Sequence, residues 1–185
     1  MIQQCGGGLS GLLHFDFNTV KPKTLEDFIN VLDSQLSRYE NLLELVPTRK
    51  EDFAVRLTNL IQTAHDKFQR NAVLLVDEYD KPLLNSIHDK QLQSDISTEL
   101  KSFYGVVKSM DQYIRFAMFT GVARFSKVSI FSDLNNLLDI SLSEAYNSIC
   151  GISETELIEH FSQTIQEMAD RKRITFDEMT ALLRR

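Results

Sequence analysis

The sequence has few of the residues that mark secreted or membrane proteins. Its two cysteines, Cys5 and Cys150, lie far apart and match no metal-ligand spacing. Free thiols are typical of the reducing cytoplasm, where structural disulfides are rare, so we expect a cytoplasmic protein. No apolar run approaches the length of a membrane span, and the N-terminus lacks the basic start and apolar core of a secretory signal. We therefore expect no membrane partner.

A surplus of positive charge is also missing. The chain has 20 Lys and Arg against 26 Asp and Glu, a formal net charge of -6. A protein that grips a nucleic-acid backbone nonspecifically over a broad face needs the opposite balance. With 185 residues, 43% of them hydrophobic, the chain is long enough for one sizeable core.

A phosphate-binding loop is absent from these residues, although Gly6, Gly7, Gly8 and Gly11 suggest one at first sight. Such a loop needs a preceding strand, the spacing Gly-x-x-x-x-Gly-Lys-Ser/Thr and a following helix. Here the first lysine is Lys21, and a strand pattern follows the glycines. We expect residues 1–11 to form a flexible leader.

What the sequence does contain is a short apolar run that ends in two acids. Residues 72–76 read Ala-Val-Leu-Leu-Val, which predicts a strand buried on both faces of a parallel sheet, and Asp77 and Glu78 follow at once. Acid pairs at this place hold Mg²⁺ and polarise water in nucleotide hydrolases, where the pattern is called Walker B. The alternative is that the acids only return the chain to water.

Two further strands and the helices between them define the predicted fold. Polar and apolar residues alternate along Leu12–Phe17, which predicts a half-buried strand with His14 and Asp16 on one face. A His beside an Asp in a strand more often has a structural role than a catalytic one. Tyr113–Thr120 is bounded by Gly121. Apolar residues at helical spacing lie between the strands. The sequence therefore predicts an α/β fold, a parallel sheet with helices on both faces.

Polar residues at the end of the third strand extend the candidate site. Thr120 would stand beside Asp77 and Glu78 if the strands are neighbours, and Arg124 could bring positive charge to the same place. The alternative is a polar strand end and a solvated arginine.

Four segments of the sequence carry a resemblance: Val73–Leu83, Phe119–Asn136, Asp139–Leu142 and Cys150–Glu154. They resemble a bacterial family of AAA-ATPase-like proteins, which are P-loop NTPases often fused to a C-terminal nuclease-like domain of the PD-(D/E)XK superfamily. The resemblance implies ATP and Mg²⁺ as ligands, ATP hydrolysis in the intact domain, and nucleic-acid contact only through the nuclease-like domain.

The same resemblance implies roles for individual residues. Asp77 would hold Mg²⁺ through water, and Glu78 would orient or activate the attacking water. Thr120 would lie at the end of the sensor strand, and Arg124 and Lys127 would lie where a contact to phosphate is plausible. Residues 1–142 would form a partial P-loop NTPase-like core, and residues 143–185 a helical lid. Capping boxes such as Ser153–Glu156 and Thr175–Glu178 mark where helices of this second part begin.

The chain departs from the family pattern because the Walker A strand and loop and the nuclease-like domain are missing, so we expect a fragment that is inactive alone. Walker A supplies charge-assisted hydrogen bonds of about 1.5–3 kcal/mol each. ATP binding should therefore be weak or absent. The missing strand should also leave an apolar sheet edge at Tyr113–Thr120, through which the chain could self-associate.

Two other functions remain open from the residues alone. A degenerate, non-catalytic interaction or scaffold module would explain the absent phosphate loop. A metal-dependent nuclease built on Asp77 and Glu78 is less well supported, because no lysine follows a second acid on an adjacent strand at the short spacing.

Overall fold

The computed structural model describes residues 11–46, 53–122, 130–131, 134, 137–146, 149 and 151–183. The chain divides into two compact units, Met1–Asn136 and Leu137–Arg185. None of the helices in the described part of the chain is both long and apolar enough to cross a bilayer.

The first unit contains a sheet of three parallel strands. These are β1 (Leu12–Asp16), β2 (Ala72–Asp77) and β3 (Ile114–Phe119), in the order β1-β2-β3 with β2 in the middle. Helices connect the strands, as parallel pairing requires. The predicted α/β class with a parallel sheet is confirmed, and each predicted strand differs from the observed one by a residue or two at its ends.

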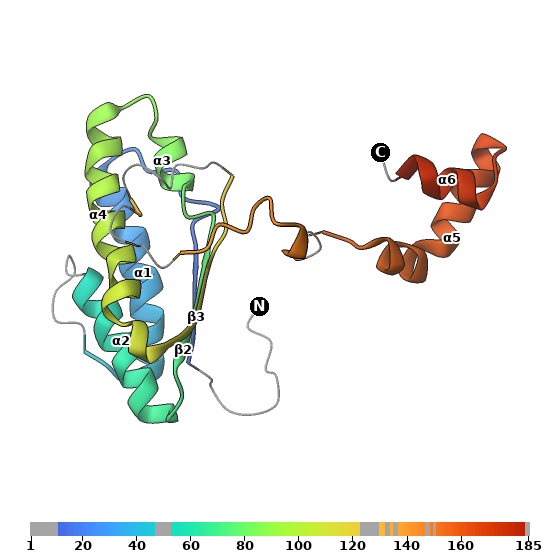
Figure 1. The fold of residues 1–185 in the computed structure, drawn as a ribbon. Helices are drawn as coiled ribbons and strands as arrows, with labels where there is room; N and C mark the ends of the chain where they lie inside the picture. Colours follow the sequence, from blue (N-terminus) through green and yellow to red (C-terminus); the bar gives the residue numbers. More distant parts are fainter. Residues whose placement is uncertain are drawn as a thin grey trace. The chain divides into compact units, whose positions relative to one another are not determined.

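Three long helices pack on one face of this sheet, as Figure 1 shows. They are α1 (Leu25–Leu43), α2 (Phe53–Phe68) and α4 (Lys90–Ser109), followed by the short 3-10 helix η1 (Asp111–Tyr113). Their apolar stripes meet the inward-facing strand residues in a single core. The sequence predicts that Thr24 caps a helix with Asp27 in its first turn, and in the structure the two residues form a reciprocal capping box at the start of α1. The sequence also predicts a capping box at Thr48–Glu51, which lies outside the described residues.

The sheet is covered differently from the prediction. Along β2, the side chains alternate between buried and partly exposed, instead of being buried on both faces. The long helices of this unit all lie on one face (Figure 1), so every second strand residue points away from them. An unbroken apolar run does not reveal this, because its residues look the same whether the second face is covered or bare.

Two further expectations need correction. The sequence predicts a loop after Asp80–Pro82, but the short helix α3 (Lys81–Asn85) forms there, with Pro82 in its first turn, where a proline is tolerated. The sequence also predicts a last strand of the sheet at Leu138–Leu142, and this prediction is wrong. Residues 137–140 have no regular structure, and Leu138 and Leu142 are exposed, since no described strand pairs with them.

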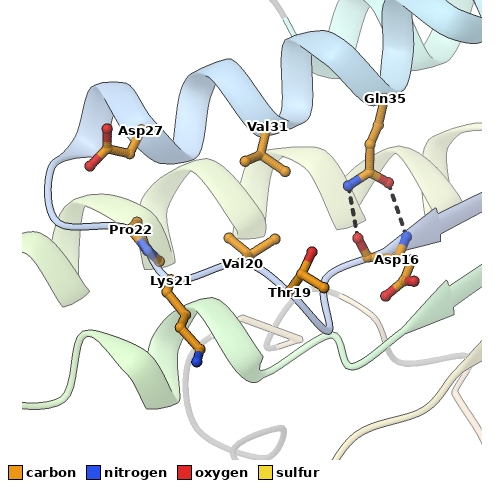
Figure 2. A pocket seen from close by; sticks show the side chains of 8 residues that line it. All are labelled: Asp16, Thr19, Val20, Lys21, Pro22, Asp27, Val31 and Gln35. Carbon is orange, nitrogen blue, oxygen red and sulfur yellow. Dashed lines mark hydrogen bonds between the residues drawn. The ribbon is translucent and has the colours of Figure 1, made fainter.

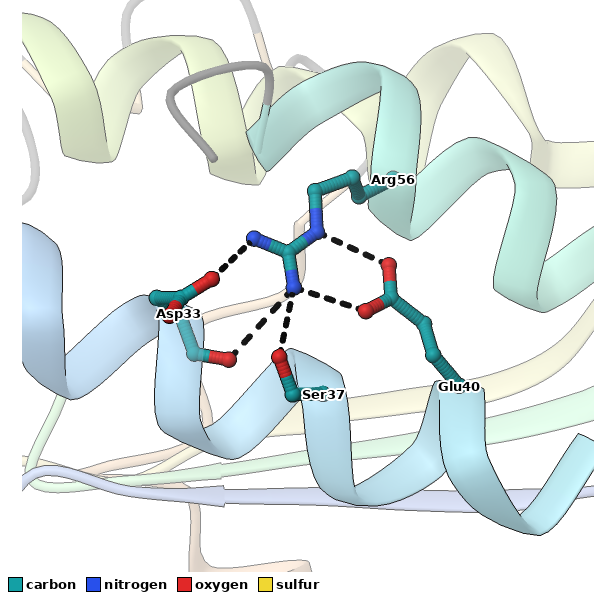
Figure 3. Close-up of polar contacts among 4 residues, drawn as sticks. All are labelled: Asp33, Ser37, Glu40 and Arg56. Atoms are coloured by element: carbon teal, nitrogen blue, oxygen red, sulfur yellow. Dashed lines mark hydrogen bonds and ion pairs between the residues drawn. The ribbon is translucent and has the colours of Figure 1, made fainter. Parts of the chain in front are cut away.

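A buried ion-pair network joins α1 to α2 (Figure 3). Arg56 is 1% exposed, and its guanidinium donates to both carboxylate oxygens of Glu40, at 2.8 and 2.7 Å. It also donates to Asp33 Oδ1 at 2.6 Å and to Ser37 Oγ at 3.0 Å. Hydrogen bonding to Glu40 raises the pKa of Arg56, so the group stays charged. The network fixes how the two helices meet.

The second unit is helical. It contains the 3-10 helix η3 (Glu144–Tyr146) and the helices α5 (Glu154–Lys172) and α6 (Phe176–Leu183). The expected capping boxes are present, since Ser153 and Glu156 bond reciprocally before α5, and Thr175 and Glu178 do so before α6. Ile165, Ala169 and Met179 form its small core.

Acid should weaken both of these caps. Hydrogen bonds from Ser153 lower the pKa of Glu156, and those from Thr175 lower the pKa of Glu178. A depressed carboxyl pKa stabilises the folded state above the unfolded value of 4.5 and stops doing so as the pH falls through the folded value. We expect the helicity measured by circular dichroism to fall below about pH 4.5. In the double variant E156Q/E178Q, which keeps neutral acceptors, this loss should shrink, and an unchanged acid transition would contradict the assignment.

Candidate functional site

The candidate site is a row of polar side chains at the carboxyl end of the sheet. Asp16 and Asp77 are register partners at the ends of β1 and β2. Thr120 directly follows β3, and its hydroxyl donates a hydrogen bond to Asp77 Oδ1. Two main-chain hydrogen bonds, both of 2.9 Å, connect the segment after β3 with β2 and the residues that follow it. The N–H of Thr120 donates to the C=O of Val76, and the N–H of Tyr79 donates to the C=O of Thr120. The expected proximity of Thr120 to Asp77 is therefore observed.

Glu78 has an unusual backbone. Its φ of 55° lies in the left-handed region, which costs a non-glycine residue about 1–2 kcal/mol. Its Oε2 is 3.7 Å from Lys81 Nζ, an ion-pair distance, and this buried atom has no hydrogen bond among the described residues. The turn directs Glu78 away from the position that a regular strand would give it, and one carboxylate oxygen keeps its hydrogen-bonding capacity.

Arg124 and Lys127 lie outside the described residues. Their expected contact with phosphate stays a prediction.

Asp80 and Gly121 are parts of the site that the sequence reasoning left without a role. The Asp80 side chain is 0% exposed, and its Oδ1 accepts the N–H of Val122 at 3.3 Å. A side chain at Gly121 would lie 2.6 Å from Asp80 Oδ1, so glycine is required there. Together these contacts hold the loop after β2 against the loop after β3. In the sequence, the Asp-Glu-Tyr-Asp run at residues 77–80 and the glycine directly after Thr120 were the features that could have indicated these two residues.

A buried tyrosine supports the same loop. Tyr104, on α4, donates its hydroxyl to the C=O of Tyr79 at 3.1 Å. Burial, with the negative charge of Asp80 nearby, raises the pKa of Tyr104 well above its ordinary value, so the phenol keeps its proton. Its ring packs against Phe119 and Phe131. The buried Tyr104 therefore connects the loop that carries Glu78 to the core, through a hydrogen bond to Tyr79, the residue after Glu78.

The variant Tyr104→Phe tests this tie. It removes one hydroxyl and leaves the C=O of Tyr79 without that donor in a buried place. We expect the free energy of unfolding, measured by urea denaturation, to fall by about 1–3 kcal/mol. The control variant is Tyr146→Phe, because Tyr146 is exposed, and it should change the free energy of unfolding little. Tyr39→Phe would not serve as a control, because the Tyr39 hydroxyl forms hydrogen bonds with the backbone of His14. Equal effects of Tyr104→Phe and Tyr146→Phe would contradict the assignment.

The first strand is fixed next to the site by a side chain of α1, as Figure 2 shows. Gln35 accepts the N–H of Asp16 and donates to its C=O, both at 2.9 Å. The Asp16 carboxylate accepts the N–H of Asn18 at 2.8 Å. These bonds border a small hollow of about 150 Å³ between the end of β1 and α1, which Lys21 and Asp27 also line. Asp16, which the sequence analysis kept out of the site, thus lies beside Asp77 on a fixed backbone.

The donor set can be compared with what a magnesium ion requires. No group of three or more His, Cys, Asp or Glu side chains within the described ranges could hold a metal ion by itself. Mg²⁺ usually keeps several waters and binds through one or two carboxylates together with the phosphates of its substrate. The exposed carboxylate of Asp77, with the Thr120 hydroxyl on one oxygen, fits that kind of partial coordination.

Comparison with known proteins agrees with this architecture. The chain is 38% identical over 146 residues to a protein from Azotobacter chroococcum mcd 1 named "Uncharacterized protein in vnfD 5'region". The match covers 79% of this chain and 28% of that relative, so the chain spans just over a quarter of its length. No solved structure matches. Residues 9–131, more than half of the chain, match the family AAA-ATPase-like, described as "Predicted AAA-ATPase", and the chain therefore belongs to this family.

Proposed function

We propose that this chain contributes the magnesium-binding and water-activating part of an ATP-binding site, and that the intact domain hydrolyses ATP. The observation that carries the proposal is the hydrogen bond from Thr120 to Asp77 at the carboxyl end of a parallel sheet, in a chain of the AAA-ATPase-like family. Open α/β sheets bind their ligands at this end.

Each residue has a part that its chemistry suits. Asp77 holds Mg²⁺ through water, and Thr120 fixes the orientation of the Asp77 carboxylate and can turn toward a phosphate. Glu78, with an oxygen not engaged in a hydrogen bond, orients the attacking water and accepts its proton. When bound, Mg²⁺ neutralises charge that develops on the phosphate oxygens. Arg124 and Lys127 supply positive charge to the phosphates.

A metal titration tests the magnesium part without requiring hydrolysis. Mn²⁺, a paramagnetic substitute for Mg²⁺, should broaden the amide NMR signals of residues 77–79 and 120–121 before those elsewhere. The variant Asp77→Asn should remove this selective broadening. Asp95→Asn, which changes another carboxylate on the helix α4, should leave it intact. Equal broadening in wild type and Asp77→Asn would refute the assignment.

Calorimetry with Mg-ATP tests the nucleotide part. For these 185 residues we expect millimolar affinity or weaker, because no Gly-x-x-x-x-Gly-Lys-Ser/Thr segment is among them to hold the β- and γ-phosphates. Submicromolar binding would contradict this expectation. Sequencing the DNA upstream of Met1 for an in-frame Gly-Lys-Ser/Thr would show whether a longer polypeptide should be titrated in parallel.

Turnover tests the role of Glu78. In the longest in-frame polypeptide that contains these residues and hydrolyses ATP, Glu78→Gln should lower kcat by about 10²–10⁴-fold, because the amide cannot accept the proton of water. Mg-ATP affinity should change little. Unchanged turnover would favour a non-catalytic interaction module instead.

A further inference from the structure

The second face of the sheet carries two apolar rows that cross all three strands. Strand register places Leu12, Val73 and Phe116 in one row, and His14, Leu75 and Met118 in the next. Leu12 is 39% exposed and Phe116 is 51% exposed. The only polar side chain among the six is that of His14, and none is an acid, a lysine or an arginine. A parallel sheet is normally covered on both faces, so this face is suited to a partner.

The two ends of this face carry opposite charges. At the carboxyl end, the next row contains Asp16 and Asp77. At the amino end, a hollow of about 700 Å³ is lined by Arg70 and Arg115 together with Leu12 and Val73 of the first apolar row. Within the described ranges, neither arginine has an ion-pair or hydrogen-bond partner. In a chain of net charge -6, this pair of cations is a local exception.

We propose that a second copy of this chain covers this face, with the two sheets face to face and their strands antiparallel. A two-fold axis between the sheets and perpendicular to the strands brings the apolar rows of both copies together. It also places Arg70 and Arg115 of each copy opposite the acidic row, Asp16 and Asp77, of the other. One chain thus carries both halves of a charge-complementary contact, which an unrelated apolar partner would not require.

The face is a better contact than the edge that the sequence suggested. β3 is an edge strand of the described sheet, but its pairing with β2 is irregular between Ala72 and Val73, and Arg115 is the residue left over. A bulge and a charge on an edge strand hinder pairing with another strand. They do not hinder packing of the face, where Phe116 and Met118 point away from the helices.

The size of the face sets the strength to expect. Strands about 4.8 Å apart and side chains of one face about 6.7 Å apart along a strand give the two rows an area of roughly 200 Å². This is well below the roughly 800 Å² per partner of a standard interface, even when the charged rims add to it. The dimer should therefore be weak, with a Kd of about 100 μM.

Sedimentation of the full 185-residue chain from about 10 μM to about 1 mM, without metal or nucleotide, measures this Kd. Phe116→Asp should raise it at least about tenfold, because a charge would then lie between the apolar rows. Phe116→Ser, which adds no charge, should raise it less. Ile87→Asp changes an apolar residue of similar exposure, 48%, outside the sheet and should have no effect. Circular dichroism checks that each variant is folded.

Charge reversal tests the antiparallel arrangement. Arg115→Glu and Asp16→Arg should each weaken the homodimer several-fold, and an equimolar mixture of the two variants should associate more tightly than either alone. Added salt should weaken the wild-type dimer. A chain that stays monomeric up to about 1 mM, or a dimer indifferent to Phe116→Asp, would overturn the proposal. A dimer that loses affinity with Phe116→Asp but is not restored by mixing would overturn the antiparallel arrangement. Asp77 belongs both to the acidic row and to the proposed Mg²⁺ site, so metal and nucleotide are left out of these measurements, which then test the face-to-face contact alone.

Discussion

Replacing Arg56 by leucine should lower the free energy of unfolding by about 3–5 kcal/mol. The reason is what the substitution leaves behind. Glu40 is 2% exposed, and the Arg56 guanidinium donates to both of its carboxylate oxygens. Without the guanidinium, a buried carboxylate must stay charged without its partner or take up a proton, and either is unfavourable. Asp33, about a third exposed, can regain water instead.

The design of the experiment separates the lost pair from the lost arginine. Urea denaturation, followed by far-UV circular dichroism, would compare Arg56→Leu with the double variant Arg56→Leu/Glu40→Leu. The double variant should recover much of the loss, because the buried charge is removed with its partner. Lys67→Leu changes an exposed cation on the same helix and should have an effect within about 0.5 kcal/mol. A double variant that is less stable than Arg56→Leu would contradict this explanation.

Replacing Gly121 by alanine should also destabilise the protein, by about 1–3 kcal/mol, and should disturb the candidate site in particular. The new methyl group would lie 2.6 Å from Asp80 Oδ1 and 2.7 Å from Tyr79 Cε1. Neither neighbour can move freely, since Asp80 is fully buried and the Tyr79 ring packs against Phe131 with centroids 5.0 Å apart. The loops after β2 and β3 must therefore separate.

Gly105→Ala is the matched control for this prediction. Gly105 lies within α4, and a methyl group there would meet nothing within 4 Å. Alanine favours a helix interior over glycine by about 1 kcal/mol, so this substitution should stabilise the protein. Opposite signs for the two variants in urea denaturation, with NMR shifts at Thr120 and Asp77 only for Gly121→Ala, are the expected result. Changes in the free energy of unfolding that have the same sign for both variants would contradict this prediction.

The sequence predicted the local features of this fold well. The capping boxes at Ser153 and Thr175 lie where the pattern placed them, Thr24 caps the start of α1, and the predicted apolar stripe from Phe53 to Phe68 lies within α2. These features depend on residues three or four apart, which meet as soon as the chain turns into a helix. The parallel sheet followed from the alternation of strands and helices, since such connections leave few other topologies.

The tertiary structure alone decided which distant residues meet. Thr120 and Asp77 are 43 residues apart, and their contact was expected only on the condition that the two strands are neighbours. Arg56 and Glu40 gave no signal, because each looked like a surface charge on its own helix. The partial exposure of residues such as Leu12 and Phe116 on the second face was equally hidden, because an apolar strand sequence does not indicate whether one or both faces of the sheet are covered. Local sequence fixes local geometry, whereas these features depend on how all the elements pack together.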